Sequence, residues 1–401
     1  MASVTCTAPV NIAVIKYWGK RDTELILPTN DSLSVTLSQD ILHSKTSISC
    51  SPDFDQDRLW LNGKEEDITK NKRMHNCFRE TRALRKQLEE KDSSLSPLSS
   101  YKVHVCSENN FPTAAGLASS ASGLAALVYT LAQLYQLPMD LSELSKIARQ
   151  GSGSACRSLF GGFVAWEQGK EKDGSDSKAV QIASEQHWPE LQALICVVSD
   201  AKKGTSSTAG MQQTIQSSTL MKERIEQVVP QRMKDMIQAI QSKNFDQFAE
   251  LTMRDSNQFH SVCLDTFPPI FYLNDTSRGI IQLIHEYNKA KGGYKAAYTY
   301  DAGPNAVIYA LEQDMKEIIQ LINHYFPEAD FTDPYGLFKD NQGQVTSSDL
   351  ISSNEFNEKV IPVYPKGSVS RLLHTKVHDG PRVLPQSESL LNDQGLPKRL
   401  A

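Results

Sequence analysis

The spacing of hydrophobic residues predicts a chain in which strands and helices interleave. Alternating or continuously apolar runs predict strands over residues 4–15, 32–38, 58–61, 101–107, 191–199, 296–300 and 306–311. Apolar positions at intervals of three and four predict helices over residues 67–90, 124–135, 141–150, 222–241, 246–259 and 270–289. Pro9 interrupts the first strand, and Asp140 with Glu143 resembles a capping box at the start of the third helix.

Two stretches lack such a pattern. Residues 331–370 show no clear period, which predicts long surface loops, and residues 181–188 carry no strong signal. A chain of 401 residues with 39% hydrophobic residues is long enough for two lobes. We therefore expect an N-terminal lobe over residues 1–187 and a C-terminal lobe over residues 188–401.

Composition excludes several classes of protein. No run reaches the roughly 18 consecutive apolar residues of a membrane span, and the N-terminus lacks the basic and apolar regions of an export signal. These features favour a cytoplasmic protein. Seven cysteines are scattered without a CxxC pair, which argues against a disulfide framework or a zinc site and predicts buried thiols.

The charge pattern favours a small anionic ligand over nucleic acid. A net charge of −5 does not suit a phosphate backbone, which needs a basic face. Small cationic groups nevertheless occur locally, at Lys16, Lys20 and Arg21, at Lys70, Lys72 and Arg73, and at Lys202 and Lys203. Such groups suit a polyanion, although solvated surface clusters have the same pattern.

The loop over residues 109–123 joins a predicted strand to a predicted helix. Ser119, Ser120 and their small neighbours would let an anion approach the unpaired N–H groups of the helix's first turn. The pattern predicts a phosphate cradle, but a serine N-cap on an ordinary buried helix fits it equally well.

A second glycine- and serine-rich loop, residues 151–162, carries Arg157. Arginine binds phosphate or carboxylate through a planar fork, so this loop is another candidate anion site. It matches neither GxGxxG, because Cys156 replaces the last glycine, nor GxSxG. Cys156 could be a nucleophile or a structural thiol. The hydroxyl-rich residues 200–208 could form a lid or a ligand contact.

Two further segments carry candidate chemistry. Residues 16–20, Lys-Tyr-Trp-Gly-Lys, could stack aromatic rings on a ligand and bind its phosphates, or form a strand end with surface lysines. Asp301 ends a predicted strand before a Gly-Pro turn, where aspartate is also an ordinary turn former.

Four long motifs occur in an order that resembles a known family. They are Ala8 to Lys20, Asn109 to Ala121, Gly151 to Ser158 and Asp301 to Val307. The second resembles the phosphate-binding motif of the GHMP kinase superfamily, with Ala118 where the kinases usually carry glycine. Together the motifs resemble the eukaryotic mevalonate diphosphate decarboxylases over residues 1–311. Residues 375–381 follow the family pattern only in part, so we assign them no role.

The resemblance implies an α+β fold, GHMP-kinase-like and two-lobed, with mixed and antiparallel sheets packed by helices around a deep cleft. It implies an ATP-dependent carboxy-lyase that converts mevalonate 5-diphosphate to isopentenyl diphosphate, ADP, phosphate and carbon dioxide, in isoprenoid and sterol biosynthesis. It also implies a cytoplasmic homodimer. A kinase that stops at the phosphate ester is the alternative, which Ala118 and the Asp301 turn disfavour. A catalytically inactive ligand sensor is disfavoured by Asp301 together with Arg157.

The matching motif positions imply the site residues. The catalytic residues would be Asp301, Arg157 and Lys16. The substrate would contact Tyr17, Trp18, Gly19, Lys20, Arg73, Ser152, Gly153, Ser154, Ala155, Cys156, Arg157 and Thr208. ATP would contact Asn109, Pro112, Ala115, Gly116, Leu117, Ala118, Ser119 and Ser120. Mg²⁺ would be held mainly by ATP, with Ser120 as a further ligand.

Overall fold

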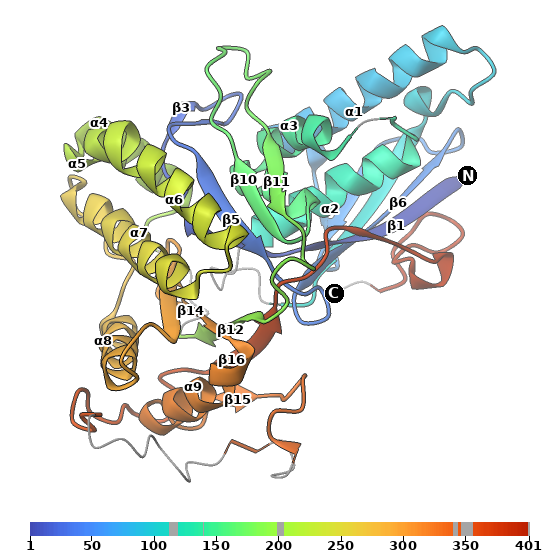
Figure 1. Ribbon diagram of the computed structural model, residues 1–401. Helices are drawn as coiled ribbons and strands as arrows, with labels where there is room; N and C mark the ends of the chain where they lie inside the picture. The colour runs from blue at the N-terminus through green and yellow to red at the C-terminus, as the bar shows by residue number, and fades with distance from the viewer. Residues whose placement is uncertain (112–118, 139, 199–203, 340–343, 346–355, 400–401) are drawn as a thin grey trace.

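A computed structural model describes residues 1–111, 119–138, 140–198, 204–339, 344–345 and 356–399, and three main sheets organise them (Figure 1). The first sheet has six strands, in the order β17 (Arg382–Leu384), β1 (Ala2–Pro9), β6 (His43–Ser51), β9 (Lys102–Asn109), β7 (Arg58–Leu61) and β8 (Lys64–Glu66). All neighbours in it are antiparallel except β7 and β9. The sheet is therefore mixed.

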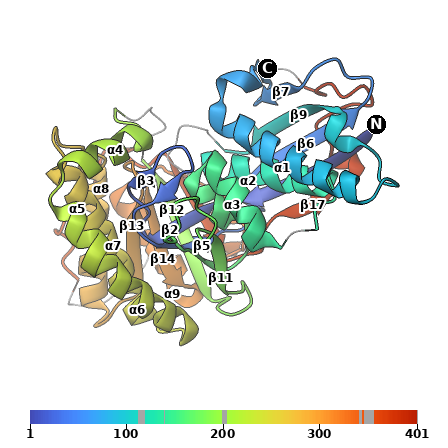
Figure 2. The same cartoon turned by 90° about the horizontal axis from the view of Figure 1, so that it is seen from above.

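Three helices pack together over the first sheet (Figure 2). They are α1 (Lys72–Lys91), α2 (Ser119–Leu134) and α3 (Leu141–Gly151), and α2 lies directly on β1 and β6. The Asp140 side chain accepts a hydrogen bond from the Glu143 N–H at 2.8 Å, so the predicted cap of α3 is confirmed. Short 3₁₀ turns flank these elements at Ile68–Lys70, Leu98–Ser100 and Gly153–Leu159, the last named η3.

The second sheet joins the two halves of the molecule. Its order is β11 (Ala179–Ala183), β10 (Phe163–Trp166), β5 (Ser32–Thr36) and β2 (Asn11–Ile15). The largest apolar cluster runs from β2 and β5 into the third sheet and its helices without a break. A small two-stranded sheet, β3 (Lys20–Asp22) and β4 (Leu27–Pro28), lies beside the end of β2.

The third sheet has the order β13 (Ala296–Tyr300), β14 (Ala306–Leu311), β12 (Leu191–Val197), β16 (Arg371–Lys376) and β15 (Asp330–Phe331). All seven residues of β12 are buried, as its continuous apolar run predicted. The helices of this half are α4 (Ser207–Ser217), α5 (Leu220–Glu223), α6 (Val229–Gln241), α7 (Phe245–Asp265), α8 (Asp275–Ala290) and α9 (Glu312–Tyr325). A π-helical turn, η4 (Arg224–Val228), joins α5 to α6. The α+β fold predicted from the resemblance is confirmed.

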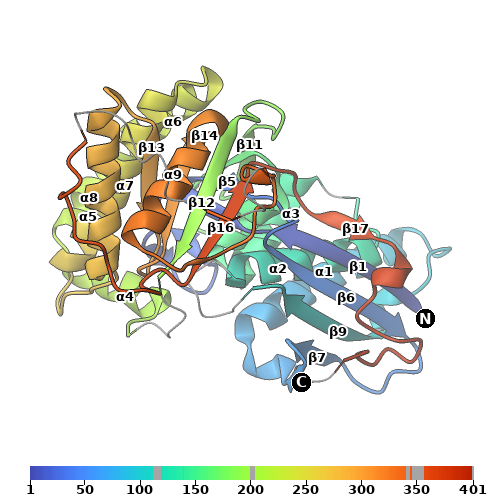
Figure 3. The ribbon, with the colours of Figure 1, turned by 90° about the horizontal axis from the view of Figure 1, so that it is seen from below.

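The C-terminal segment crosses between the halves. β16 pairs with β12, whereas β17 pairs with β1 on the other side of the molecule (Figure 3). Between them His378 donates its N–H to Thr36 and accepts one from Gly162, so this segment touches the second sheet as well. The residues of β17 thus lie in the first sheet, although they were expected in the C-terminal lobe. The division near residues 187 and 188 stays a prediction.

Several elements differ from the sequence prediction. The predicted strand over residues 4–15 becomes two strands in different sheets, because the chain turns after Pro9. The helix expected from residue 270 starts at Asp275, where Asn274 forms a capping box with Ser277. α9, β11, β16 and β17 were not predicted; β17 is short and none of its three residues is buried, so its sequence carries little hydrophobic signal.

Two further expectations concern the cysteines and the absence of membrane-spanning segments. All seven cysteines are buried and unbridged, so the predicted buried thiols are confirmed. Within the described part of the chain, no helix is long and apolar enough to cross a membrane.

Candidate active site

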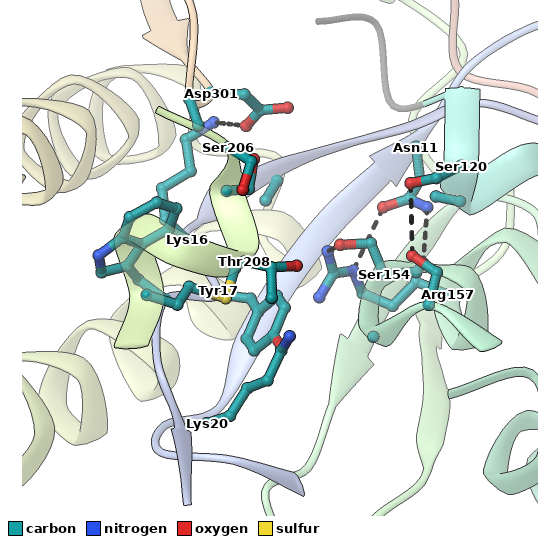
Figure 4. A pocket seen from close by; sticks show the side chains of 18 of the residues that line it. Asn11, Lys16, Tyr17, Lys20, Ser120, Ser154, Arg157, Ser206, Thr208 and Asp301 are labelled. Carbon is teal, nitrogen blue, oxygen red and sulfur yellow. Dashed lines mark hydrogen bonds and ion pairs between the residues drawn. The ribbon is translucent and has the colours of Figure 1, made fainter. Parts of the chain in front are cut away.

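A cavity of about 440 Å³ opens where all parts of the fold meet (Figure 4). The end of β2, the turn after β13, the first turns of α2 and α4, and η3 form its walls. The lining residues are Asn11, Ala13, Lys16, Tyr17, Trp18, Lys20, Arg73, Ser119, Ser120, Ala121, Ser152, Gly153, Ser154, Arg157, Ser206, Ser207, Thr208, Met211, Phe259, Asp301 and Ala302. The cavity therefore gathers residues from all four motifs.

Lys16 and Asp301 form an ion pair in this cavity. The Lys16 Nζ donates to Asp301 Oδ1 at 2.7 Å, although 285 residues separate the two in sequence. The Lys16 side chain is almost fully buried, and one third of the Asp301 side chain is exposed. Burial lowers the pKa of Lys16, while the charges of Asp301 and Asp255 oppose that shift. The pair thus presents an oriented carboxylate to the cavity.

Arg157 lies across from this pair in Figure 4 and is held by three polar side chains. Its guanidinium donates to Asn11 Oδ1 at 3.2 Å, to Ser154 Oγ at 3.3 Å and to the Ser32 hydroxyl. Burial lowers the pKa of Arg157 from its usual value, although arginine stays charged in proteins. A fixed buried cation of this kind suits a bound carboxylate or phosphate.

Some of the residues after Lys16 are candidate ligand contacts, whereas others support the wall of the cavity. Tyr17 packs against Trp166 with ring centroids 4.6 Å apart, and its buried hydroxyl makes no hydrogen bond to the described residues. Trp18 is buried, and its indole N–H donates to Thr214 at 3.0 Å, so Trp18 mainly supports the cavity wall. Gly19 has a φ of +88°, and a Cβ there would lie 2.7 Å from Thr29 Oγ1.

Two cations, Lys20 and Arg73, line the same cavity. Burial, together with the charge of Arg73, lowers the pKa of Lys20 to about 8. Arg73 lies in the first turn of α1, and its guanidinium is 3.5 Å from the Thr208 hydroxyl. The expected substrate residues Lys20, Arg73 and Thr208 are therefore brought together, as a polyanionic ligand would require.

The loop that carries Arg157 contributes only some of the residues that were expected to contact the substrate. Ser152, Gly153 and Ser154 line the cavity. Ala155 and Cys156 instead point into the core, because the 3₁₀ turn η3 directs them away from the cavity. Burial raises the pKa of Cys156 to about 12, which favours a structural thiol over a nucleophile.

The expected phosphate cradle lies partly in the described structure. Ser119 and Ser120 form the first turn of α2 and line the cavity, with Ser120 Oγ 3.5 Å from Ser152 Oγ. Asn109 ends β9 and accepts from the Ser44 hydroxyl at 2.5 Å. Pro112, Ala115, Gly116, Leu117 and Ala118, and the lysines at 202 and 203, lie outside the described residues.

A second cavity lies next to the first and shares Arg73, Ser120 and Ser152 with it. Its volume is about 610 Å³, and its other lining residues are Leu59, Leu61, Glu66, Asp67, Lys70, Asn71, Lys72, Leu124 and Gly151. The two cavities meet at the start of α2. One extended ligand could therefore reach from the second cavity to Lys16 and Asp301.

Sequence reasoning missed several residues of the first cavity. Asn11 lies within the first motif and bridges Arg157, Ser154 and Ser158. A buried amide within an apolar strand was the signal for it. Ser206, in contrast, belongs to the hydroxyl-rich residues 200–208 that were predicted as a lid or a ligand contact. It caps α4 by accepting from the Ala209 N–H at 3.2 Å, and α4 thus presents a second helix N-terminus to the cavity. Met211 and Phe259 carried no comparable signal, because they resemble core residues.

The arrangement of sheets and helices is the GHMP kinase fold, which the solved mevalonate diphosphate decarboxylases share. Residues 8–179 match the Diphosphomevalonate decarboxylase-like N-terminal domain, and residues 193–384 match the Mevalonate 5-diphosphate decarboxylase C-terminal domain. The chain belongs to the diphosphomevalonate decarboxylase family. The predicted enzyme class, an ATP-dependent decarboxylase of the mevalonate pathway, is confirmed by this membership.

The likeness to relatives covers both chains almost completely. The diphosphomevalonate decarboxylase of Ganoderma lucidum is 61% identical over 98% of this chain and 98% of its own. A crystal structure of a mevalonate 5-diphosphate decarboxylase is 52% identical with a TM-score of 0.91, covering 98% of this chain and 99% of that one. A more distant structure, of MDDEF in complex with MVAPP, AMPPCP and magnesium, is 28% identical with a TM-score of 0.74, covering 96% and 99%.

Proposed function

We propose that the cavity around Lys16, Arg157 and Asp301 is where mevalonate 5-diphosphate is phosphorylated and decarboxylated. The observation that carries this proposal is the Lys16–Asp301 ion pair, 2.7 Å long, in the same cavity as the first turn of α2. A carboxylate for a hydroxyl group and a helix N-terminus for phosphates are the two parts that phosphoryl transfer to an alcohol requires.

In the first step Asp301 acts on the 3-hydroxyl of the substrate. Its carboxylate accepts the hydroxyl proton as the oxygen attacks the γ-phosphorus, and the bond from that phosphorus to the β,γ-bridging oxygen breaks to release ADP. Lys16 holds the carboxylate in place through its ammonium group. The product of this step is a tertiary phosphate ester.

In the second step the ester becomes the alkene. The C–O bond to phosphate breaks with its electron pair leaving on phosphate, and cationic character develops at C3. The bond from C2 to the carboxylate then breaks, and its electron pair forms the double bond as carbon dioxide leaves. Arg157, fixed by Asn11 and Ser154, holds the carboxylate in line. Asp301 returns the proton that it accepted to the departing phosphate, and the carboxylate thus restored stabilises the developing charge.

ATP fits the two neighbouring cavities. Its phosphates would lie at Ser119 and Ser120, where the N–H groups of the first turn of α2 face the cavity. Its nucleoside would lie in the second cavity, which meets the first at the start of α2. Ser120, whose hydroxyl is a hard oxygen donor of the kind that Mg²⁺ takes alongside phosphates, would hold Mg²⁺ together with ATP, and the ion would neutralise charge on the transferring phosphate.

The diphosphate of the substrate fits the cationic part of the cavity. Lys20 and Arg73 supply positive charge, and Tyr17 and Thr208 offer hydroxyl groups. The Tyr17 hydroxyl, which is buried and makes no hydrogen bond to the described residues, would gain a partner when the substrate binds. The remaining expected contacts, Ser152 to Ser154, lie on the same wall.

The proposal extends to the oligomeric state of the protein and to its location in the cell. Membership of the family supports a cytoplasmic homodimer, and analytical ultracentrifugation of the purified protein would test the oligomeric state.

The decisive experiment incubates the purified protein with MgATP and mevalonate 5-diphosphate and follows ADP and carbon dioxide together. We expect one carbon dioxide per ADP. ADP without carbon dioxide would identify a kinase that stops at the phosphate ester, and the absence of both products would refute the proposal.

A further inference from the structure

A largely buried charge cluster contacts the backbone of Lys16. Asp255, on α7, accepts hydrogen bonds from Arg224 at 2.9 and 3.0 Å and from Arg232 at 3.0 Å. Asp255 and Arg224 have no exposed side-chain surface, and Arg232 has 16%. Burial would raise the pKa of Asp255, but the two arginines outweigh it, so the pKa lies below its usual value and Asp255 is ionised.

This cluster forms hydrogen bonds with the backbone of Lys16. The Lys16 N–H donates to Asp255 Oδ2 at 2.7 Å, and its carbonyl accepts from Arg224 at 3.0 Å. The Asn30 amide donates to the same carbonyl at 3.0 Å. Both polar backbone groups of Lys16 are therefore fixed by side chains from other elements, which fixes the point from which its side chain reaches Asp301.

The same turn of α7 also holds the backbone next to Asp301. Ser256 Oγ accepts from the Tyr300 N–H at 3.1 Å. Phe259, three residues further along α7, lines the cavity. Consecutive positions of one helix thus contact the chain beside each member of the Lys16–Asp301 pair.

Stability alone is a weak reason for such a cluster. Taking charges out of water is costly, and apolar replacements of buried ion pairs are often as stable. A rigid helix that carries contacts to both partners, however, sets the distance between them, and small misplacements of catalytic groups are costly in rate.

We propose that Asp255, with Arg224 and Arg232, is a positioning cluster through which α7 aligns Lys16 with Asp301 for catalysis. The inference rests on the proposed function, because it assigns the cluster to the reaction of that pair. It goes beyond that function by placing residues that do not line the cavity among those that determine the rate.

The cluster also affects the pKa of the Lys16 ammonium group. The charged groups that face Lys16 are Asp301, Asp255 and Arg157, and His260 is neutral because burial lowers its pKa to about 3. Asp255 raises the pKa of Lys16 against the effect of burial. Removing this negative charge would leave the pKa of Lys16 lower, so its ammonium form would be lost at a lower pH.

The first test replaces Asp255 by asparagine, which keeps the shape of the side chain and removes its charge. We expect Asp255→Asn to lower kcat about tenfold or more while both KM values stay within about threefold. The alkaline limb of its kcat profile should move to lower pH by about one unit. Ser256→Ala should lower kcat too, but without moving that limb, because it removes no charge.

Glu89→Gln is the matched control. It removes a carboxylate from buried Arg85, which Glu89 Oε1 contacts at 2.8 Å on α1, far from the cavity. This variant should be destabilised but keep the wild-type pH profile and kcat at temperatures where it is folded. An equal loss of kcat in Glu89→Gln would overturn the proposal, because general destabilisation would then explain Asp255→Asn.

Arg232→Gln is the second variant in case Asp255→Asn does not fold. It removes the hydrogen bond that Arg232 donates to Asp255 at 3.0 Å, so Asp255 is held less firmly and kcat should fall several-fold while both KM values stay within about threefold. A wild-type kcat in the folded variant overturns the proposal. Failure of the proposed function would be distinct, since the wild type would then form no carbon dioxide, whereas failure of this inference leaves the wild type active.

Discussion

At the scale of single residues, the chemistry depends on charged groups whose partners are far away in sequence. Asp301 reads as a turn former in its own segment, its family motif implied a catalytic role, and the structure adds that Lys16 lies 2.7 Å from it. For Cys156 the sequence left a nucleophile and a structural thiol open, and burial, which raises the pKa of the thiol to about 12, favours the structural thiol.

Replacement of Asp301 by asparagine tests the central residue. Asp301→Asn keeps the size of the side chain but cannot accept a proton, so kcat should fall by about 10³-fold or more while both substrates bind nearly normally. Steady-state kinetics with binding by calorimetry would measure this. Carbon dioxide release at the wild-type rate would contradict the role given to Asp301.

The pH dependence of substrate affinity should report Lys20. Its pKa of about 8 means that the ammonium form dominates below pH 8 and is lost above it. We expect kcat/KM for mevalonate 5-diphosphate to fall as pH rises through about 8. Lys20→Arg should remove that fall, because arginine stays protonated throughout. A fall that persists unchanged in Lys20→Arg would assign it to another group.

At the scale of elements, helix starts and tight turns place the site. α2 and α4 both begin at the cavity, so two helix N-termini offer N–H groups to one region. The 3₁₀ turn η3 brings Ser154 and Arg157 to the same wall while it buries Ala155 and Cys156. Close packing behind this turn leaves room only for glycine at its first position.

Substitution of Gly153 tests that packing. A Cβ there would lie 2.8 Å from the Trp166 ring and 2.9 Å from the Tyr17 ring, so Tyr17 would have to move. We expect Gly153→Ala to raise KM for mevalonate 5-diphosphate about tenfold. Gly293→Ala, whose new Cβ would have its nearest neighbour at 3.9 Å, is the control and should leave KM unchanged. Equal KM values in the two variants would show that Tyr17 does not contact the substrate.

At the scale of the whole molecule, the C-terminal segment ties the halves together. After β16 the chain passes the second sheet and adds β17 to the first. Beyond β17, Leu391 packs against Trp60 and Cys106, and His104 hydrogen-bonds the Gly395 carbonyl at 2.9 Å. None of these residues lines the cavity, so the end of the chain should matter for stability more than for catalysis.

Truncation after Pro385 tests this separation. Loss of the apolar contacts of Leu391 should lower Tm by several degrees, because a buried leucine contributes about 1.5–3 kcal/mol. The kcat at 25 °C should stay within about twofold of the full chain. Calorimetry and the coupled assay would measure the two effects. A large loss of kcat in the folded truncated protein would show that the segment acts on the cavity.

The sequence by itself determined the strands with strong apolar runs, the capped helix α3, the buried cysteines and four motifs whose order identified the family. These features are local, because periodicity, capping and motif chemistry depend on neighbouring residues. Only the tertiary structure decided that Lys16 pairs with Asp301, that Asp255 accepts a hydrogen bond from the Lys16 N–H, and that β17 joins the first sheet. Those contacts join residues more than 200 positions apart, so no local pattern predicts them. Burial, which shifts the pKa values of the charged groups, arises only once the chain has folded.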